Sequence, residues 1–576
     1  MTPIRLSHDG LSVLRVAQRA LLGFSIVGSL IFTAAPGFAA GLPLERPDDP
    51  PLPAAKAPPG ARSAANVSFG RFTHIQVNVN GLGANIPGDA ANEPSIAVDP
   101  NDHNRMAIGW RQFDNVASNF RQAGFGFTTN GGLTWTAGKI EPGVFRSDPV
   151  LHSDGAGNFF YNSLTSTSII TTQLFPSTDG GATWGASTFA FGGDKQWMTI
   201  DRTGGLGHDH IYQAWSTAAN SYEPNTFNRS NDDGDTFQSP SIIPDSPVWG
   251  TLDVASDGTL YVVGTEGPGG LIFVARSTDA KNALVTPTFT TVPVDLGGFV
   301  QTGGPNPAGL LGQLWVAVDR STGPRAGWIY VLGSVRTEND PLDVNFIRST
   351  DGGQTWSVPL RVNDDPSGNR AFQWFGSMSV SPEGRIDAVW NDTRASADST
   401  KSALYYSYST DGGSSWSVNE QASPIWTSTV GFPNQAKIGD YCHMVSDSDG
   451  ADLAWAATFS GGQDVYYVRI PSLVPVAVAE PPGRGARLHA GSPNPFTSAT
   501  SIRFDVPPAG SRVKLEVFDA GGHRVATLVD AFVPGGTHLA RWAGVDRSGR
   551  TMNAGVYFAR FEADGHRESR KLMLLR

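Results

Sequence analysis

The sequence predicts an all-β protein in two parts, a set of repeated antiparallel sheets followed by a small β-sandwich. Three observations carry this prediction. A turn phrase, Ser-Thr-Asp-Gly-Gly-Ala-Thr-Trp at 177–184, recurs along the chain, and short apolar segments recur between its copies. Turn-forming residues are abundant, with 67 Gly and 40 Pro, while charged residues make up only 16% of the chain. A phrase that returns at intervals of about 50–70 residues is typical of repeat architectures.

The repeated phrase has the chemistry of a hairpin turn. Asp179 can accept hydrogen bonds from backbone amides two residues on, and Gly180 and Gly181 supply positive φ. Trp184 is large enough to fill the gap between neighbouring units. Near-complete copies stand at 349–356 and 409–416, looser ones at 128–135 and 230–237, and a decayed one begins at 277.

This phrase resembles the Asp-box, or BNR, repeat of the sialidase superfamily. The resemblance implies a β-propeller fold. In that superfamily the box is a structural hairpin, found in hydrolases and in non-catalytic binding propellers alike. The boxes themselves therefore imply no activity.

The number of units follows from a second series of segments. Seven short apolar strands end in turn residues, whereas only six boxes can be counted, and the last unit lacks one strand. The alternating segment 74–79 precedes the first unit and can supply that strand, which would close the ring and remove its exposed edges. We therefore predict a seven-bladed β-propeller over 69–479, with six blades as the alternative. The seven segments are 93–100, 147–154, 195–201, 249–257, 313–319, 374–382 and 441–449.

The N-terminus is typical of an exported protein. Arg15 and Arg19 precede an apolar run at 21–35, so residues 1–40 are predicted to be a signal peptide, with an uncleaved anchor as the alternative. Residues 41–68 are Pro- and Ala-rich, as in an extended linker. No later segment is apolar and long enough for a membrane span, so no transmembrane helix is expected in the mature protein.

Charge and cysteine content exclude several classes of function. The formal net charge is −11, with the acidic excess in the repeat region, so nucleic acid is not expected as a partner. The single cysteine, Cys442, excludes an internal disulfide and a cysteine-based zinc cluster, and it is interpreted as a small buried apolar residue. No metal site of this kind is expected.

Candidate site residues lie in loops on the face away from the boxes. Arg111, Arg336 and Arg394 follow the second strands of three units. Through the sialidase resemblance, these arginines could grip a substrate carboxylate, because the guanidinium fork matches a carboxylate bidentately. The same resemblance implies Tyr441 with Glu266 as the nucleophile pair and Asp148 as the acid. Trp249 and Trp374 would form a sugar-stacking or packing surface at the same mouth.

The sequence matches the sialidase pattern only in part. That family has an Arg-Ile-Pro phrase on its opening strand, and Glu-Pro-Ser-Ile at 93–96 stands in the comparable place. The alternative interpretation is that the three arginines brace loops by pairing with the neighbouring Asp114, Glu338 and Asp392.

One acidic loop of the sequence is a candidate cation site. Asp447, Asp449 and Asp452 are spaced like oxygen ligands on a loop, so structural calcium is possible. The glycine is misplaced for an EF-hand and an Asp-stabilised turn is the alternative. No other cofactor is expected.

The C-terminal part has a different character. After a linker at 480–490, residues 491–576 contain many short alternating strands, as in a β-sandwich. Pro-Asn-Pro-Phe at 493–496, Trp-Ala-Gly at 542–544, Gly-Val-Tyr at 555–557 and Lys-Leu-Met-Leu-Leu at 571–575 resemble the C-terminal sorting domain of type IX secretion, which looks like the immunoglobulin-like domain of the FlgD-like hook-capping protein. This resemblance implies handling by the secretion machinery and release or attachment at the cell surface.

Two functions remain open from the sequence. The first is a secreted or outer-membrane-attached sialidase-like glycoside hydrolase that acts on an extracellular glycan or glycoprotein. The second is a non-catalytic propeller that binds carbohydrate or protein. The missing Arg-Ile-Pro phrase favours the second, while the three arginines at corresponding positions favour the first.

Overall fold

The computed structural model describes residues 49–54, 66–166, 169–216, 222–473, 486–492, 494–507, 509–563 and 565–575. The predicted signal peptide (1–40) and most of the two predicted linkers (41–68 and 480–490) lie outside these residues. The described chain contains strands and no helix, which confirms the all-β class. Accordingly, none of its elements is a helix with the length and apolar character needed to cross a membrane.

The chain divides into two compact units. The first comprises the chain up to Ser446 together with Asp452–Arg469, and the second comprises Asp447–Ala451 with Ile470–Arg576. Each unit is described by itself below.

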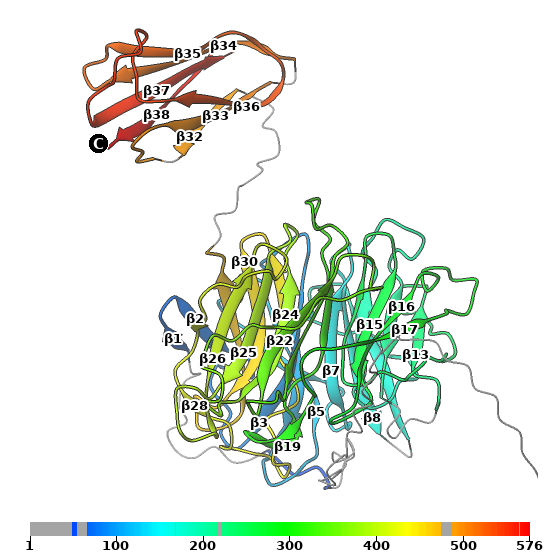
Figure 1. Cartoon of the computed structure of the whole chain (residues 1–576). Coiled ribbons are helices and arrows are strands. Elements are labelled where there is room, and N and C mark those ends of the chain that lie inside the picture. The colour runs from blue at the N-terminus through cyan, green and yellow to red at the C-terminus, as the bar shows by residue number, and fades with distance from the viewer. Residues whose placement is uncertain are drawn as a thin grey trace, which may run out of the picture. The chain divides into compact units, whose positions relative to one another are not determined.

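Apart from the two-stranded hairpin β18–β19, strands β1 to β31 form seven antiparallel sheets of three to five strands, which follow one another along the chain (Figure 1). Four of these sheets come first in the chain after β2. The first two are β3–β6 (Ala90–Val98, Met106–Phe113, Gln122–Thr128, Thr136–Ile140) and β7–β10 (Ser147–Ser153, Phe159–Ser166, Ile170–Ser177, Thr188–Phe189). The next two are β11–β13 (Trp197–Ile200, Ile211–Ala214, Phe227–Ser230) and β14–β17 (Leu252–Val254, Leu260–Thr265, Ile272–Ser277, Thr290–Val294).

Two further sheets and a hairpin come next. They are the hairpin β18–β19 (Thr302–Gly303, Asn306–Leu310), the sheet β20–β23 (Trp315–Val318, Ile329–Val335, Asp343–Ser349, Leu360–Arg361) and the sheet β24–β28 (Gln373–Val380, Ile386–Asp392, Lys401–Ser409, Glu420–Gln421, Trp426–Thr427). The remaining sheet joins the two ends of this unit, with β1 (Val67–Phe69) and β2 (Phe72–Gln76) added to β29–β31 (His443–Asp447, Gly450–Ala457, Asp464–Pro471) in the order β1-β2-β31-β30-β29.

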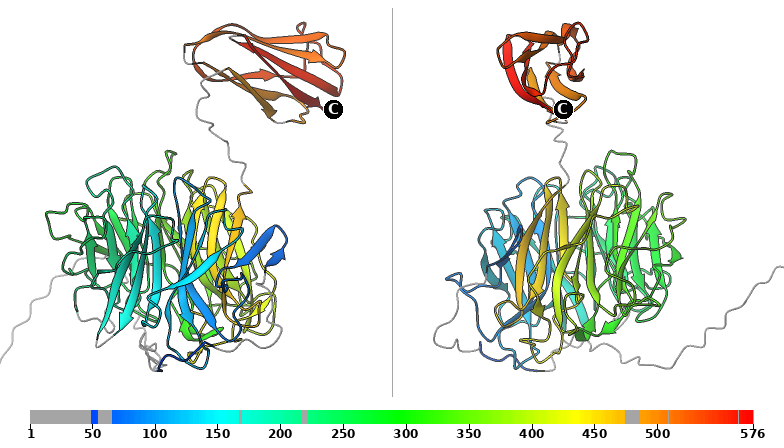
Figure 2. Two further views of the ribbon diagram at one scale, coloured as in Figure 1. Left: turned by 180° about the vertical axis from the view of Figure 1, so that it is seen from behind. Right: turned by 60° about the vertical axis from the view of Figure 1, so that its left-hand side comes forward.

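The N-terminal strand completes the last sheet, as the sequence predicts. β2 pairs antiparallel with β31, with His74 opposite Val468, and the Val77 amide donates to the Val465 carbonyl at 2.8 Å. Figure 2 shows the blue N-terminal strands beside the yellow strands of the last sheet. Asp464 reinforces this joint, because its Oδ1 accepts hydrogen bonds from Gln76 Nε2 (3.0 Å) and Asn78 Nδ2 (2.8 Å).

One end strand of each sheet lies beside the corresponding end strand of the next. We call these seven strands the inner strands: β3, β7, β11, β14, β20, β24 and β29. Ser379 on β24 accepts the Ser446 amide of β29 at 2.8 Å, and Ser95 on β3 lies 2.9 Å from His443 Nδ1 on β29. Contacts therefore lead from β3 along the series to β29 and back to β3.

The repeated phrases form tight turns after the third strands. Ser177 Oγ donates to Asp179 Oδ1 at 2.9 Å, and the Gly181 amide donates to Ser177 Oγ at 2.9 Å. Asp179 Oδ1 also accepts the Thr183 amide, which is four residues on and not two as predicted. Trp184 contacts the rings of Tyr161 in its own sheet and Phe125 in the preceding sheet, at centroid distances of 5.5 and 6.0 Å, so it packs between sheets.

The C-terminal unit consists of two small sheets around one core. They are β32-β33-β36 (Arg487–Ser492, Thr500–Val506, Gly536–Trp542) and β35-β34-β37-β38 (Arg524–Val533, Ser511–Asp519, Gly555–Ala563, His566–Leu574). Side chains such as Phe504, Trp542 and Phe561 fill the space between the sheets. Two sheets that share an apolar core are the arrangement of a β-sandwich.

Candidate functional site

Non-glycine residues with positive φ mark the starts of several inner strands. Glu93 (φ 52°), Asp148 (φ 46°), Lys195 (φ 55°), Trp249 (φ 58°) and Phe375 (φ 57°) stand in comparable places. In β3, β7 and β24 the register shifts at this point. Bulges of this kind re-aim a side chain, and backbone in this region persists only where the surroundings hold it.

The charged members of this series take part in a buried cluster of ion pairs, which we call the axial ion cluster. Asp440 is its centre: Oδ2 lies 2.6 Å from Lys195 Nζ and 2.7 Å from Lys437 Nζ. Lys195 Nζ also lies 3.2 Å from Asp148 Oδ2. The full set is Glu93, Arg111, Asp148, Lys195, Lys437 and Asp440.

Glu93 connects a third cationic residue, Arg111, to the cluster. Arg111 Nε lies 3.2 Å from Glu93 Oε2 and donates to Asn92 Oδ1 at 2.8 Å, and Lys437 Nζ lies 3.4 Å from Glu93 Oε1. Burial raises the pKa of Glu93, while Arg111, Lys195 and Lys437 oppose that shift. None of the six side chains belongs to a residue more than 4% exposed. Three acids thus meet three bases away from solvent, an arrangement that is stable only while every charge keeps its partner.

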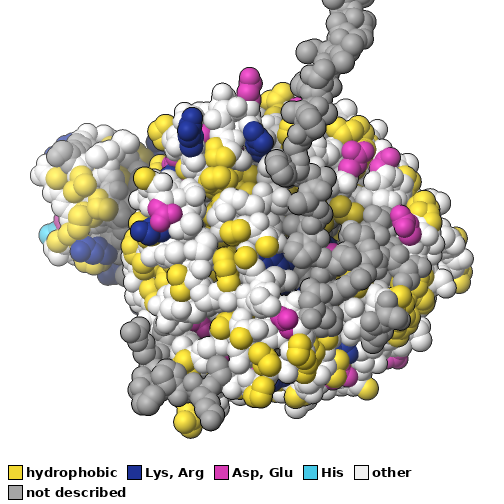
Figure 3. Space-filling model, turned by 90° about the horizontal axis from the view of Figure 1, so that it is seen from below, with side chains coloured by type: hydrophobic (Ala, Val, Ile, Leu, Met, Phe, Trp, Pro, Cys, Tyr) yellow, Lys and Arg dark blue, Asp and Glu magenta, His cyan; other side chains and the backbone are white. Residues whose placement is uncertain are grey.

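A cover separates the axial ion cluster from solvent. Asn306 and Leu310 on the β18–β19 hairpin bind the segment at 436–440: Asn306 Nδ2 donates to the Gly439 carbonyl (2.7 Å), Asn306 Oδ1 accepts the Ile438 amide (2.9 Å), and Leu310 donates to Asp440 Oδ1 (2.8 Å). This hairpin lies at the lower edge of Figure 1, and Figure 3 shows that face from below. The acidic and basic side chains of described residues that this view displays are spread over it, in places next to one another.

Tyr441 is buried beside the same cluster. It is 2% exposed, and its hydroxyl donates to the Pro149 carbonyl at 2.8 Å. Burial, followed by Glu93 and Asp148, raises the pKa of Tyr441 well above its usual value. A nucleophilic phenolate requires the opposite shift. The structure therefore brings Tyr441 and Asp148 together, but in surroundings that favour the neutral phenol.

The other proposed member of the nucleophile pair lies elsewhere. Glu266 is exposed, and its Oε2 accepts the Leu271 amide at 3.3 Å. Arg336 is also exposed, and its backbone pairs with that of Phe299. In the described part of the chain no hydrogen bond or ion pair joins either side chain to Tyr441.

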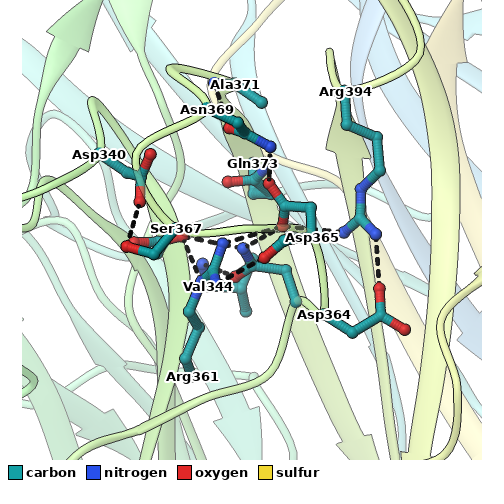
Figure 4. A network of polar contacts seen from close by, with 12 residues as sticks. Asp340, Val344, Arg361, Asp364, Asp365, Ser367, Asn369, Ala371, Gln373 and Arg394 are labelled. Carbon is teal, nitrogen blue, oxygen red and sulfur yellow. Dashed lines mark hydrogen bonds and ion pairs between the residues drawn. The ribbon is translucent and has the colours of Figure 1, made fainter.

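Arg394 belongs to a separate network. Its Nε lies 2.8 Å from Asp392 and its NH2 lies 3.3 Å from Asp365, while its guanidinium lies 4.5 Å from the centre of the Tyr405 ring. Figure 4 shows Asp365 between Arg361 and Arg394. Arg394 thus pairs with Asp392, as the loop-bracing alternative predicts.

The three arginines therefore contact three different sets of partners. Arg111 pairs with Glu93 and not with Asp114, which instead lies 2.8 Å from Lys139. No hydrogen bond or ion pair recorded for the described residues brings Arg111, Arg336 and Arg394 to a common point.

The two predicted stacking tryptophans have different surroundings. Trp374 is fully buried, donates from Nε1 to Ser402 Oγ at 2.9 Å, and packs against Phe375 and Trp426. It is a core residue and not part of an open surface. Trp249 is half-buried and packs against the apolar cluster of the β14 and β20 sheets.

Two of the three aspartates considered for calcium, Asp447 and Asp452, already have protein partners for their carboxylates. Asp447 Oδ1 accepts the amides of Asp449 and Gly450, each at 2.8 Å, as in a simple Asx turn. Asp452 accepts the Tyr467 hydroxyl at 2.7 Å and pairs with Arg469 at 3.0 Å. These contacts satisfy the turn alternative, and calcium stays a prediction.

Sequence reasoning missed Asn306 and Lys437, which help to enclose the mouth. Both lie in Gly- and Pro-containing segments without a periodic pattern, and Asn306 meets Gly439 across 133 residues. No local signal in the sequence points to that contact.

No family model and no curated protein matches this sequence. Among solved structures, the chain is similar to a fungal alcohol oxidase of the AA5 family in complex with copper (12% identity, TM-score 0.42, covering 89% of this chain and 100% of that one). It is also similar to Trypanosoma rangeli sialidase (11%, 0.34, 87% and 88%) and to PorZ, a surface component of the type-IX secretion system of Porphyromonas gingivalis (10%, 0.28, 89% and 87%). At these identities and TM-scores, none of these likenesses assigns an activity to the chain.

Proposed function

We propose that this protein is an exported seven-bladed β-propeller that binds an extracellular carbohydrate or protein without hydrolysing it. One observation carries the choice of binding over catalysis. Tyr441 and Asp148, the proposed nucleophile and acid, are at most 2% exposed and lie against the axial ion cluster, beneath the β18–β19 hairpin. A substrate bond cannot be cleaved by groups that it cannot reach.

The architecture that we propose is consistent with the strand pairing. Seven sheets follow one another in β1–β31, and β2 completes the last of them. The two-sheet C-terminal unit is consistent with a sorting sandwich that directs export. The proposal includes a location outside the cell or on the outer membrane. It also includes recognition by the secretion machinery and a glycan or glycoprotein as the binding partner. No nucleic acid and no cofactor belong to it.

Hydrolysis can be tested directly. The purified protein is incubated with a panel of chromogenic glycosides that includes a sialoside, and we expect no turnover above the buffer blank. Binding is measured in parallel on a glycan array and against candidate extracellular proteins. Sialoside turnover that disappears in Tyr441→Phe would overturn the proposal, since that variant removes only the hydroxyl bound to Pro149.

The calcium prediction has its own test. We expect the melting temperature to be the same in EDTA and in excess calcium, because Asp447 and Asp452 have partners within the protein. A melting temperature that rises with calcium concentration would establish a bound ion.

A further inference from the structure

A channel runs along the axis on the opposite side from the axial ion cluster. Six of the seven inner strands line it, namely β7, β11, β14, β20, β24 and β29. Its volume is about 580 Å³, which lies within the range of pockets that hold small organic molecules. The lining continues into the turns that follow the inner strands, such as Thr203 and Ser256, so the channel opens on the face that carries the repeat turns.

Three rings close the inner end of this channel. The Trp197 ring meets Trp315 edge-on at 5.2 Å and His443 at 5.4 Å, and Trp315 stacks on His443 at 5.5 Å. On its far side Trp197 contacts Tyr441 at 5.2 Å. Trp197 begins β11 two residues after Lys195, and it contacts Tyr441 on one side and lines the channel on the other, so the rings form a layer between the axial ion cluster and the channel.

His443 presents a hydrogen-bond donor to the channel. Its Nδ1 accepts the Ile96 amide at 3.2 Å and lies 2.9 Å from Ser95 Oγ. Burial lowers the pKa of His443 to about 3, so the ring is neutral and its proton sits on Nε2. His443 lines the channel, and Nε2 has no hydrogen-bond partner among the described residues. The π-face of an aromatic guest could accept a weak hydrogen bond from it.

The charged residues that line the mouth of the channel are Arg202, Arg320 and Asp253. Arg320 pairs with Asp253 at 2.6 Å. Arg202 donates instead to the carbonyl and hydroxyl of Ser153, each at 2.7 Å, and within the described residues no carboxylate lies at ion-pair distance from it. Desolvation, followed by Arg320, lowers the pKa of Arg202 to about 10, while Asp154, Asp253 and Asp99 act in the opposite direction. Burial, His443 and then these two arginines lower the pKa of His152 in the channel wall. Among the described residues, the Arg202 guanidinium thus has no direct ion-pair partner, and Asp154, Asp253 and Asp99 act on it from farther away.

We infer that this axial channel binds a small organic monoanion, a carboxylate with a flat aromatic body. The carboxylate would lie at the mouth, where the Arg202 fork matches its geometry. The flat body would lie against Trp197 and Trp315 and the apolar wall formed by Ala317, with edge-on or offset ring contacts.

The charge of the ligand follows from the charges at the mouth. Asp253 pairs with Arg320, while Asp154, Asp253 and Asp99 act on Arg202 only from beyond ion-pair distance, so Arg202 can take one direct ion-pair partner. One carboxylate on a ligand would supply that partner. A polyanion would add uncompensated charge to a protein whose formal net charge is already −11.

The test uses 2-naphthoate as the probe and isothermal titration calorimetry of the purified protein. We expect one site per chain, and binding weaker by about ten-fold or more in Arg202→Gln, because a charge-assisted hydrogen bond is lost. The neutral analogue 2-naphthylmethanol should bind more weakly than 2-naphthoate by a similar factor, and acetate should not bind measurably. Arg348→Gln is the matched control, since Arg348 bonds to Gly412 and Ser414 outside the channel and should leave the affinity unchanged.

A second variant tests the location of the binding site independently of its charge. Ser256 is exposed at the channel mouth, so Ser256→Trp should fold normally and block binding. The inference is wrong if 2-naphthoate shows no binding up to roughly 5 mM, a bound on the useful affinity range. It is also wrong if the alcohol binds as tightly as the carboxylate, or if Ser256→Trp binds like the wild type. The inference does not depend on the proposed function, because glycoside turnover would overturn that function and leave this result unaffected.

Discussion

Asp440→Asn should destabilise the first unit strongly, because it removes the charge that two buried ammonium groups share. Asp440 Oδ2 lies 2.6 Å from Lys195 Nζ and 2.7 Å from Lys437 Nζ, and all three residues are at most 4% exposed. Removing one partner of a buried ion pair costs about 3–5 kcal/mol, since the remaining charge stays desolvated. Asparagine is almost the same size and can still accept the Leu310 amide, so this cost is electrostatic.

A double-mutant cycle separates the ion pair from general disruption. In Lys195→Met with Asp440→Asn, two acids and two bases remain in the cluster, so we expect the double variant to recover about 2–3 kcal/mol relative to the sum of the single variants. The matched control is Asp114→Asn, which breaks the half-exposed pair with Lys139 at 2.8 Å and should cost less than about 1 kcal/mol.

Tryptophan fluorescence in guanidinium chloride measures this unit, because every tryptophan except Trp542 precedes residue 470. Two outcomes would refute the reasoning. One is a cost for Asp440→Asn as small as that of the surface control. The other is a double variant whose cost equals the sum of the two single costs.

Three further changes test other parts of the structure. Burial raises the pKa of Asp464 from 3.8 to about 6, so the folded state binds more protons than the unfolded state between these values, and stability should fall as the pH rises from about 4 to 6. Unfolding of Asp464→Asn at pH 4–8 should lack this slope, and an unchanged slope would contradict the assignment. Gly413→Ala would place Cβ 2.1 Å from the Phe346 ring at a φ of 77°, so it should lower stability by more than Gly368→Ala, which has positive φ but open space. Burial raises the pKa of Cys442 to about 12, so Ellman's reagent should label it only after unfolding; prompt labelling of the native protein would show otherwise.

The parts of the fold that depend on local chemistry were predictable from the sequence. The Ser177–Asp179 turn forms because its hydroxyl, carboxylate and glycines lie within a few residues of one another. The borrowed strand β2 was predictable because the last unit lacks one strand and the alternating segment 74–79 was available. The observed strand ends at Gln76, three residues earlier than that segment, since the chain then turns toward Asn80.

The arrangement of the candidate site was not predictable in the same way. The position of Tyr441 before an inner strand suggested an open mouth, and whether that mouth is covered depends on Asn306, 133 residues from its partner Gly439. Arg111 has Asp114 three residues away, yet it pairs with Glu93 across the strand pair because a bulge turns Glu93 toward it. Side chains that meet across sheets leave no periodic signal in a single sequence.

The β18–β19 hairpin that covers the axial ion cluster also imposes an energetic cost on any substrate that would reach Tyr441. To reach the phenol from that face, a ligand would have to break the hydrogen bonds that Asn306 and Leu310 make with the segment at 436–440, three in all. At about 1 kcal/mol each, this lowers affinity by roughly two orders of magnitude before any ion pair of the cluster is disturbed. The channel on the other side requires no such opening, because His443 and Arg202 already line a cavity of about 580 Å³. A ligand that approaches along the axis is therefore admitted at less cost through the face that carries the repeat turns.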